Sequence, residues 1–265
     1  MGKMDPPAQP SGTELNREYY SDLLPGKDHY WRKMAAPRFR VRTLLALLAE
    51  LEDLQGLQGK PQSLIDLGCG SGQLLADIAR RFPQLKLAGA DLSEPQLDVN
   101  RRAMPGCQFY AMDLGRPDAV PDSLVGRFAV VTASEVIEHV DHPGVLLANA
   151  HRLCAPGGRL LLSTQSGRVG ETERRVGHLR HFTAAEMSVF LNECGWRPLR
   201  VWNSGYPFHD LSKWYANRNP DALLKEFADK PYGLKEDLIC LLLRLAFRLN
   251  STQRGAQLFS VAQRD

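Results

Sequence analysis

The sequence lacks any hydrophobic run long enough to cross a membrane. Its longest apolar stretch, Leu238 to Leu249, is short and is interrupted by Arg244 and Arg248, whereas a spanning helix needs about 20 apolar residues. Residues 1–13 are polar and rich in proline, without the apolar centre of a signal peptide. We therefore expect neither a membrane span nor a secretory signal.

Cysteine pairs and an excess of charge are also missing. The five cysteines are scattered and never form a Cys-x-x-Cys pair, which argues against a disulfide scaffold, a zinc knuckle or an iron–sulfur cluster. We expect a protein of the reducing cytoplasm. The 33 basic and 30 acidic residues leave a net charge of only +3, so no general attraction for nucleic acid is expected.

What is present is the composition of a globular protein. Hydrophobic residues make up 43% of the 265 residues and charged residues 24%, and this length suits one large domain, alone or with a small cap. We expect five segments: a flexible tail (1–13), an N-terminal helical lid (14–59), a core (60–204), a helical insertion or cap (205–256) and a final core strand (257–265).

Short apolar strands alternate with amphipathic helices through the core. The predicted strands are 63–67, 85–90, 108–112, 128–133, 159–164, 198–203 and 257–263. The predicted helices are 38–54, 73–82, 94–104, 143–154 and 184–194, with Ser93 and Thr183 as N-caps. Repeated strand–helix units predict an α/β fold, a parallel sheet with helices on both faces.

A glycine-rich loop, Asp66 to Gly72, follows the first strand of this alternation. Its glycines at alternate positions permit a sharp turn and a close approach of backbone to ligand, and the next helix offers unpaired N–H groups. The loop does not fit G-x-G-x-x-G, because Gln73 and Leu75 occupy the possible last positions, and it has no Gly-Lys-Ser/Thr. The pattern favours a ligand without a phosphate at this loop.

Acidic residues end the next two strands. The two carboxylate oxygens of Asp91 can accept hydrogen bonds from two ribose hydroxyls, and Asp113 can accept one from an exocyclic amine such as that of adenine. Met112 could pack against the base. Together with the loop, these residues predict a site for a nucleoside.

Taken in order, these motifs resemble those of the class I S-adenosylmethionine (SAM)-dependent methyltransferases. The resemblance rests on the segments Leu64–Gly72, Gly89–Ser93, Ala111–Asp113, Glu135–Val140 and Leu153–Gly158, and it covers residues 60–203. It implies SAM as the cofactor and a Rossmann-like sheet of seven strands, the last antiparallel. It also implies that Asp66, Gly68 and Gly70 hold the methionine moiety. The expected cofactor-binding residues are Asp66, Gly68, Cys69, Gly70, Asp91, Leu92, Met112, Asp113 and Ser134.

A Glu-x-x-Glu-His cluster follows the fourth predicted strand. In a helical turn Glu135, Glu138 and His139 would share one face, and two carboxylates with an imidazole could bind a divalent metal ion. Two further histidines, His178 and His181, stand downstream. We expect Glu135, Glu138, His139 and His181 to be catalytic, with His139 as a general base, and Glu135, Glu138, His139 and His178 to be the metal ligands if a metal is bound.

This cluster is similar to the metal site of two families: the ubiquinone-pathway O-methyltransferases, and the small-RNA 3′-terminal 2′-O-methyltransferases, which add a later histidine. It also resembles a segment of small-molecule methyltransferases that bind no metal. In those enzymes Glu138 would cap or form a salt bridge, and His139 would pack near the donor. Metal-assisted and metal-free reactions both stay open at this point.

The flanks of the core carry weaker signals. Two arginines, Arg38 and Arg40, could meet the carboxylate of the donor, although a solvated helix face is favoured. Tyr206 and His209 could line the acceptor pocket. The aromatic residues Tyr19, Tyr20, Tyr30 and Trp31 could form the closing part of the lid. Near the end of the cap we expect the apolar side chains Leu241, Leu242, Leu245 and Phe247 to pack in a core rather than form a dimer face.

These observations predict a methyltransferase that moves a methyl group from SAM to a hydroxyl of a small organic molecule, as a monomer or homodimer. Two alternatives remain. One is a metal-dependent methyltransferase acting on the 3′-terminal 2′-hydroxyl of RNA, which the balanced charge disfavours. The other is a SAM-binding pseudoenzyme that serves as a scaffold through segment 205–256.

Overall fold

The computed structural model describes residues 33–53, 63–218 and 233–265. The predicted tail and the aromatic residues of the predicted lid lie outside the described residues. Of the lid segment, the structure describes the long helix α3 (Ala35–Asp53). No described helix is both long enough and apolar enough to cross a membrane.

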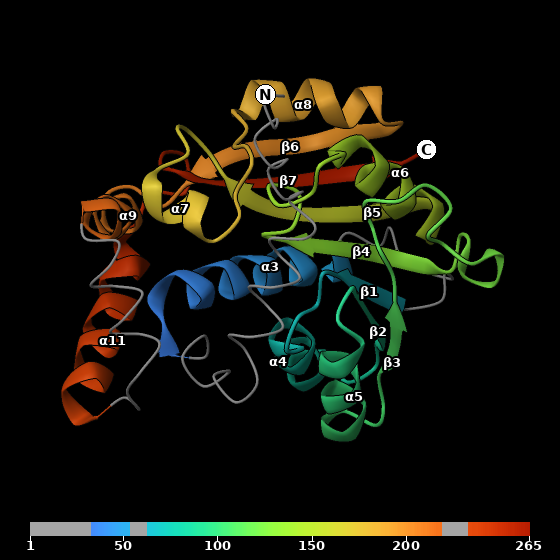
Figure 1. Ribbon diagram of the computed structural model, residues 1–265, viewed down its shortest axis with the longest axis horizontal. Helices are drawn as coiled ribbons and strands as arrows, with labels where there is room; N and C mark the ends of the chain where they lie inside the picture. Colours follow the sequence, from blue (N-terminus) through green and yellow to red (C-terminus); the bar gives the residue numbers. More distant parts are fainter. Residues whose placement is uncertain (1–32, 54–62, 219–232) are drawn as a thin grey trace, which may run out of the picture.

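One sheet runs through the centre of the molecule (Figure 1). Its seven strands lie in the order β3-β2-β1-β4-β5-β7-β6. Their bounds are β1 Ser63–Leu67, β2 Lys86–Asp91, β3 Gln108–Ala111, β4 Phe128–Ser134, β5 Cys154–Gln165, β6 Trp196–Ser204 and β7 Gln257–Arg264. Strand β7 runs antiparallel to β5 and β6, whereas β3, β2, β1, β4 and β5 are parallel. The predicted seven-stranded, mostly parallel sheet is confirmed.

The remaining elements follow the predicted alternation closely. They are α4 Gln73–Arg81, α5 Glu94–Ala103, η1 Asp122–Leu124, α6 Pro143–Leu153, α7 Glu171–Arg175, α8 Ala184–Glu193, α9 Phe208–Arg218, α11 Leu234–Ala246 and η2 Phe247–Leu249. Thr183 caps α8 as predicted, since its hydroxyl accepts from the backbone N–H of Glu186. Ser93 occupies the N-cap of α5 but makes no side-chain cap bond. Gly157 lies within β5, whose pairing with β4 shifts register between Phe128 and Val130.

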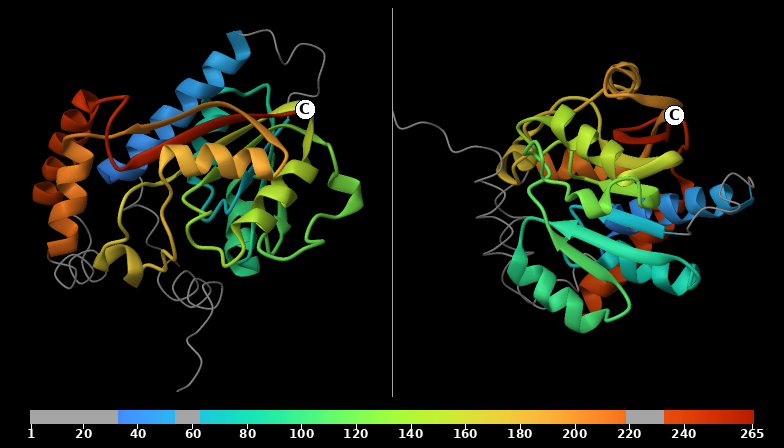
Figure 2. Two further views of the ribbon diagram at one scale, coloured as in Figure 1. Left: turned by 90° about the horizontal axis from the view of Figure 1, so that it is seen from above. Right: turned by 90° about the vertical axis from the view of Figure 1, so that its right-hand side faces the viewer.

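Helices cover both faces of the sheet, as Figure 2 shows from two further directions. One buried cluster joins α6 and α8 to one face through Leu146, Leu147 and Met187. The other joins α3, α4 and α5 to the opposite face, and the leucines of α3 at helical spacing, such as Leu44 and Leu48, belong to it. Burial of this apolar stripe holds α3 against this face of the sheet.

The cap differs from the prediction. Helices α9 and α11 form there, but Leu241, Leu242 and Leu245 are 45%, 57% and 47% exposed. The expectation that they pack in a core is wrong, because α11 turns another side toward α3. Phe247 alone of the four is buried, and it packs edge-on against Phe39 of α3.

Candidate active site

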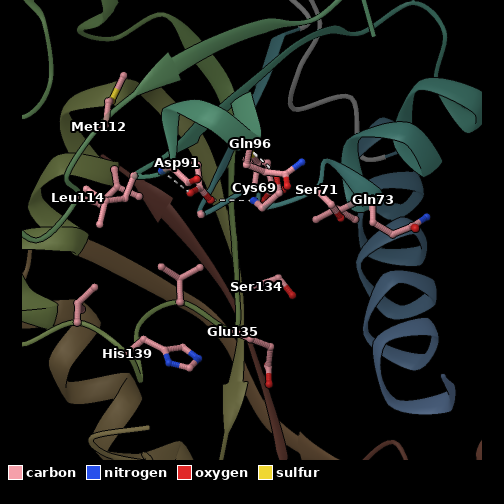
Figure 3. Close-up of a pocket in the computed structure, with 18 of the residues that line it drawn as sticks. Cys69, Ser71, Gln73, Asp91, Gln96, Met112, Leu114, Ser134, Glu135 and His139 are labelled. Carbon is pink, nitrogen blue, oxygen red and sulfur yellow. Dashed lines mark hydrogen bonds between the residues drawn. The ribbon is translucent and has the colours of Figure 1, made fainter. Parts of the chain in front are cut away.

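A cavity of about 320 Å³ opens at the carboxyl ends of β1, β2, β3 and β4, the position where open α/β sheets bind ligands. All nine residues predicted to bind the cofactor line it, and so do Glu135 and His139. Figure 3 shows Met112, Asp91 and Cys69 toward one end and Glu135 and His139 toward the other. We call these the donor end and the transfer end of the cavity.

The glycine loop brings bare backbone to the donor end. Gly68 has a φ of +64°, and a Cβ there would lie 2.5 Å from Cγ2 of Val136, so a larger residue would meet both backbone strain and a clash. Gly70 has a φ of +47°, and no atom lies within 4 Å of the place where its Cβ would be. The main chain at Gly70 can therefore be approached closely by a ligand.

Two acids of the donor end, Asp91 and Asp113, are held by backbone N–H groups. The carboxylate of Asp91 accepts from the N–H of Gly70 at 2.8 Å and from that of Ser93 at 3.0 Å. The carboxylate of Asp113 accepts from the N–H of Gly115 at 3.2 Å. Carboxylate oxygens have further lone pairs, so both acids can still accept hydrogen bonds from a ligand while their orientation is fixed.

Asp66 is the most buried acid lining this cavity. Its carboxylate is 3% exposed and accepts a hydrogen bond of 2.6 Å from the hydroxyl of Thr132 on β4. Burial raises the pKa of Asp66 to about 7, despite the opposing effect of the Thr132 hydrogen bond. A nearby positive charge would favour its ionised form, so Asp66 suits a ligand that carries an ammonium group.

Arg40 on α3 lines the cavity as well, so its placement on a solvated helix face was wrong. Its side chain is 14% exposed, and its guanidinium lies 3.7 Å from the carboxylate of Glu135. Pro37 and Val41 of the same helix also line the cavity, which is the i, i+3, i+4 spacing of one helix face. Arg38 instead pairs at 2.5 Å with the buried Asp77 of α4.

The segment after β4 does not form the predicted helical turn. Glu135 has a φ of +57°, and its backbone N–H still bonds to Ser163 of β5, so Glu135 and Glu138 do not share a helix face. The Glu135 carboxylate accepts from Nε2 of Gln165 at 2.9 Å and of Gln257 at 2.8 Å. Burial would raise the pKa of Glu135, but Arg40 and these two amides lower it to about 2.

Behind Glu135, three other side chains come together. One ligand atom each from Glu138, His139 and His178 lies within 4.8 Å of the others. Neither oxygen of Glu138 has a hydrogen-bond partner in the described part of the chain, although the carboxylate is fully buried. Burial and the charge of Glu135 raise the pKa of Glu138 well above its ordinary value. Such a carboxylate is costly to bury unless a proton or a cation accompanies it.

The histidines form a short chain leading away from the cavity. Nδ1 of His139 lies 3.2 Å from the carbonyl oxygen of Gly177, and Nδ1 of His178 lies 2.9 Å from Nε2 of His181. Burial lowers the pKa of His139, and it lowers the pKa of His178 to about 3 and of His181 to about 4. Of the three, His139 alone lines the cavity. His181 contacts His178 and is outside the group of three.

Two cap residues expected to line the acceptor pocket are absent from the lining. His209 is buried between Phe39 and Phe247, and Tyr206 is 55% exposed. Lys213 of the same cap does connect to the transfer end, because its Nζ donates to Oε1 of Gln165 at 3.2 Å, the amide that also holds Glu135. No sequence pattern pointed to this link.

Several known proteins are similar to this chain. A family model described as a methyltransferase domain matches residues 30–202. The chain is 30% identical over 145 residues to the malonyl-[acyl-carrier protein] O-methyltransferase of Halalkalibacterium halodurans, covering 54% of this chain and 50% of that protein. It is 34% identical over 116 residues to the ubiquinone biosynthesis O-methyltransferase of Pseudomonas paraeruginosa, covering 43% and 48%. The chain thus spans about half the length of these relatives.

The fold also resembles solved structures. The 1,6-didemethyltoxoflavin-N1-methyltransferase of Burkholderia thailandensis, solved with its substrate and S-adenosylhomocysteine, superposes with a TM-score of 0.57 at 17% identity. The match covers 98% of this chain and 93% of that one. At such low identity the likeness concerns the fold alone.

Proposed function

The chain belongs to the methyltransferase domain family, and from this membership we propose that it transfers a methyl group from SAM to a hydroxyl of a small organic molecule. One observation carries the proposal: a single cavity collects the glycine loop, Asp91 and Asp113 at the ends of neighbouring strands. The bare backbone of the loop suits the methionine moiety of SAM, Asp91 suits its ribose, and Asp113 suits its adenine.

At the donor end each part of SAM has a partner. Asp91 would bind the two ribose hydroxyls, while Asp113 would accept from the adenine amine beside Met112. The ammonium of the methionine moiety would lie near Asp66, whose carboxylate faces the cavity. Arg40, on the α3 side of the cavity, is a cation suited to the methionine carboxylate.

At the transfer end the protein must align the acceptor and remove its proton. Methyl transfer is an in-line displacement at carbon, so orientation and exclusion of water supply much of the rate. Burial keeps His139 neutral, and its contact with Gly177 favours the tautomer that carries the proton on Nδ1. Nε2 is then the basic nitrogen that can accept the hydroxyl proton. Two relatives named as O-methyltransferases support an oxygen acceptor.

Glu138, His139 and His178 also fit a divalent metal ion. This is an alternative to the base, because Nε2 of His139 would then hold the metal ion and could not accept the proton. Two imidazoles and a carboxylate are ligands that such ions accept, and the buried, unpartnered oxygens of Glu138 are what a cation would satisfy. When bound, a metal ion lowers the pKa of a hydroxyl close to it. Addition of Mg²⁺, Mn²⁺ or Zn²⁺ to chelator-treated protein should then raise its melting temperature, and Glu138→Gln should remove the increase.

The experiment that tests the function has two parts. Titration calorimetry with S-adenosylhomocysteine should give a dissociation constant well below millimolar, and methyl-labelled SAM should label a compound in a panel of phenols and other small alcohols. If the protein binds S-adenosylhomocysteine but labels no compound and no extract, the SAM-binding scaffold is favoured over an enzyme. If only the 3′ end of an RNA is labelled, the acceptor is RNA and the proposal of a small organic acceptor is wrong. No binding would refute the proposal.

A further inference from the structure

Helix α11 presents its apolar side to solvent and its polar side to the protein. It packs on α3, and the residues on that side are Asp237, which pairs with Lys33 at 2.7 Å, and the buried Cys240. On the opposite side Leu238 and Leu242 are 56% and 57% exposed, and Leu249 of the following η2 is 74% exposed. Amphipathic helices on globular domains normally have the reverse orientation.

The exposed leucines form one continuous stripe. Leu234, Leu238, Leu242 and Leu245 lie three or four residues apart, so they fall on one side of the helix. These four leucines form the centre of the stripe. Ile239, Leu241 and Leu243 widen it, Leu249 of η2 extends it, and all of these side chains are exposed. Contiguous apolar surface of this extent marks an interaction site rather than ordinary solvent-facing surface.

The charges along this stripe have one sign. Lys235 and Arg248 are exposed, and no carboxylate of the described residues pairs with either. The two acids of α11 are engaged elsewhere: Glu236 accepts from the backbone N–H of Gly233 at 2.9 Å, and Asp237 holds Lys33. The stripe thus combines aliphatic side chains with unpaired cations.

The neighbouring helix α9 carries a similar surface. It contacts η2 at the end of α11, and both helices lie at the same edge of the molecule (Figures 1 and 2). Leu211, Trp214 and Tyr215 of α9 are more than half exposed, and the guanidinium of Arg218 lies over the ring of Trp214 at 4.6 Å. Tryptophan and tyrosine are enriched where proteins meet the headgroup region of a bilayer.

We propose that this surface, α11 together with α9, binds an anionic lipid bilayer. Helix α11 lies in the plane of the membrane with its leucines below the headgroups, while Lys235 and Arg248 contact lipid phosphates. Its 13 residues are too few to span the bilayer. A second copy of the chain fits less well, since a twofold interface would set the same unpaired cations against each other.

Vesicle sedimentation with the full chain tests the inference. The protein should bind phosphatidylcholine vesicles that contain phosphatidylglycerol, bind vesicles of phosphatidylcholine alone more weakly, and dissociate as salt is added. The double variant Leu238→Ser/Leu242→Ser should reduce partitioning at least about tenfold. Lys235→Gln/Arg248→Gln should reduce binding and remove the preference for anionic lipid.

Val189→Ser/Leu199→Ser is the matched control, because these two exposed apolar residues lie on α8 and β6, away from α9 and α11. It should bind vesicles as the unchanged protein does. Melting curves and binding of S-adenosylhomocysteine should be the same for all variants, which separates this inference from the proposed function. Absence of vesicle binding would overturn it. A dimer in light scattering that Leu238→Ser/Leu242→Ser converts to monomer would overturn it in favour of self-association.

Discussion

The donor end and the transfer end of the cavity are held in place by different kinds of contact. At the donor end the carboxylates of Asp91 and Asp113 are fixed chiefly by backbone N–H groups of their own or the adjacent loop. At the transfer end Glu135 depends on side chains from β5, β7 and α3, among them Gln165 and Gln257. The donor end therefore depends mainly on backbone groups, apart from Asp66, which Thr132 of β4 holds, and the transfer end depends on side chains from distant strands.

This difference implies a division of labour that kinetics can test. Groups fixed by backbone should act on the affinity for SAM, because in the proposed function they would contact the part of the donor that does not react. Groups assembled from distant strands should act on the rate of transfer, or, like Glu135 beside Arg40, on the affinity for SAM through the side chain that they hold. Four substitutions probe the two ends, in order of decreasing expected effect.

Replacement of His139 should produce the largest loss. His139→Gln removes the proposed base and should lower kcat by roughly 10²–10⁴-fold, with the dissociation constant of S-adenosylhomocysteine nearly unchanged. Single-turnover transfer at saturating SAM and titration calorimetry measure the two quantities. An equal loss in the transfer rate and in the affinity for S-adenosylhomocysteine would mean that His139 contributes to donor binding. The donor end and the transfer end would then not be functionally separate.

Asp91→Ala should weaken donor binding by roughly 10²–10³-fold. The substitution removes two hydrogen bonds to a charged group, each worth about 1.5–2 kcal/mol. Asp98→Ala on α5 is the matched control, because Asp98 pairs only with the exposed Arg101 and should leave affinity unchanged. Calorimetry with S-adenosylhomocysteine provides the comparison. Retention of full affinity by Asp91→Ala would mean that the ribose lies elsewhere.

Glu135→Gln should have an intermediate effect that links the two ends. Removal of this charge leaves Arg40 without its carboxylate and should raise the KM for SAM by roughly tenfold, with a smaller change in kcat. Glu135→Asp should recover part of the affinity. If Glu135 instead acts directly on the acceptor or on a metal ion, kcat should fall while the affinity for S-adenosylhomocysteine stays the same.

Asp66 should make donor binding depend on pH. The pKa of Asp66 is about 7 in the folded protein, above the ordinary value of 3.8. Because an ammonium group binds the ionised form of Asp66, the carboxyl group must release its proton when the donor binds. Affinity for S-adenosylhomocysteine should therefore increase by up to about tenfold between about pH 6 and pH 8. Asp66→Asn should bind more weakly and show no such increase. Calorimetry in buffers of different ionisation enthalpy would detect the released proton.

The same shift affects stability in the opposite sense. The folded protein holds the Asp66 proton more tightly than the unfolded chain, so this group favours folding most at low pH and loses that contribution as pH rises toward 7. Melting curves of the ligand-free protein and of Asp66→Asn should differ in slope over this range. Identical slopes would contradict the raised pKa.

The sequence predicted the donor end because each of its residues follows a recognisable strand. Parallel strands bring their carboxyl ends to one edge, so the order of the motifs along the chain was enough to place Asp66, Asp91 and Asp113 around one cavity. Local sequence patterns did not predict that Arg40 lines the cavity. Its position depends on how α3 packs across the sheet through Leu44 and its neighbours.

Two expectations failed where tertiary contacts override local pattern. Glu135 leaves the helical path because its backbone still pairs with β5 while distant amides hold its carboxylate. In α11 the helical period was correct, but apolar spacing does not say which side a helix buries. The contact between Asp237 and Lys33 and the burial of Cys240 face the polar side inward, contrary to the usual rule.

The position of β7 between β5 and β6 imposes an order on synthesis. Strand β6 meets the rest of the sheet only through β7, which the ribosome makes after the whole α9–α11 segment. For several seconds, at about 5–20 residues per second, a nascent chain that has completed β6 exposes two unpaired strand edges, those of β5 and β6. Unpaired edges promote aggregation, so a chain released before β7 is made should aggregate more readily than the complete chain.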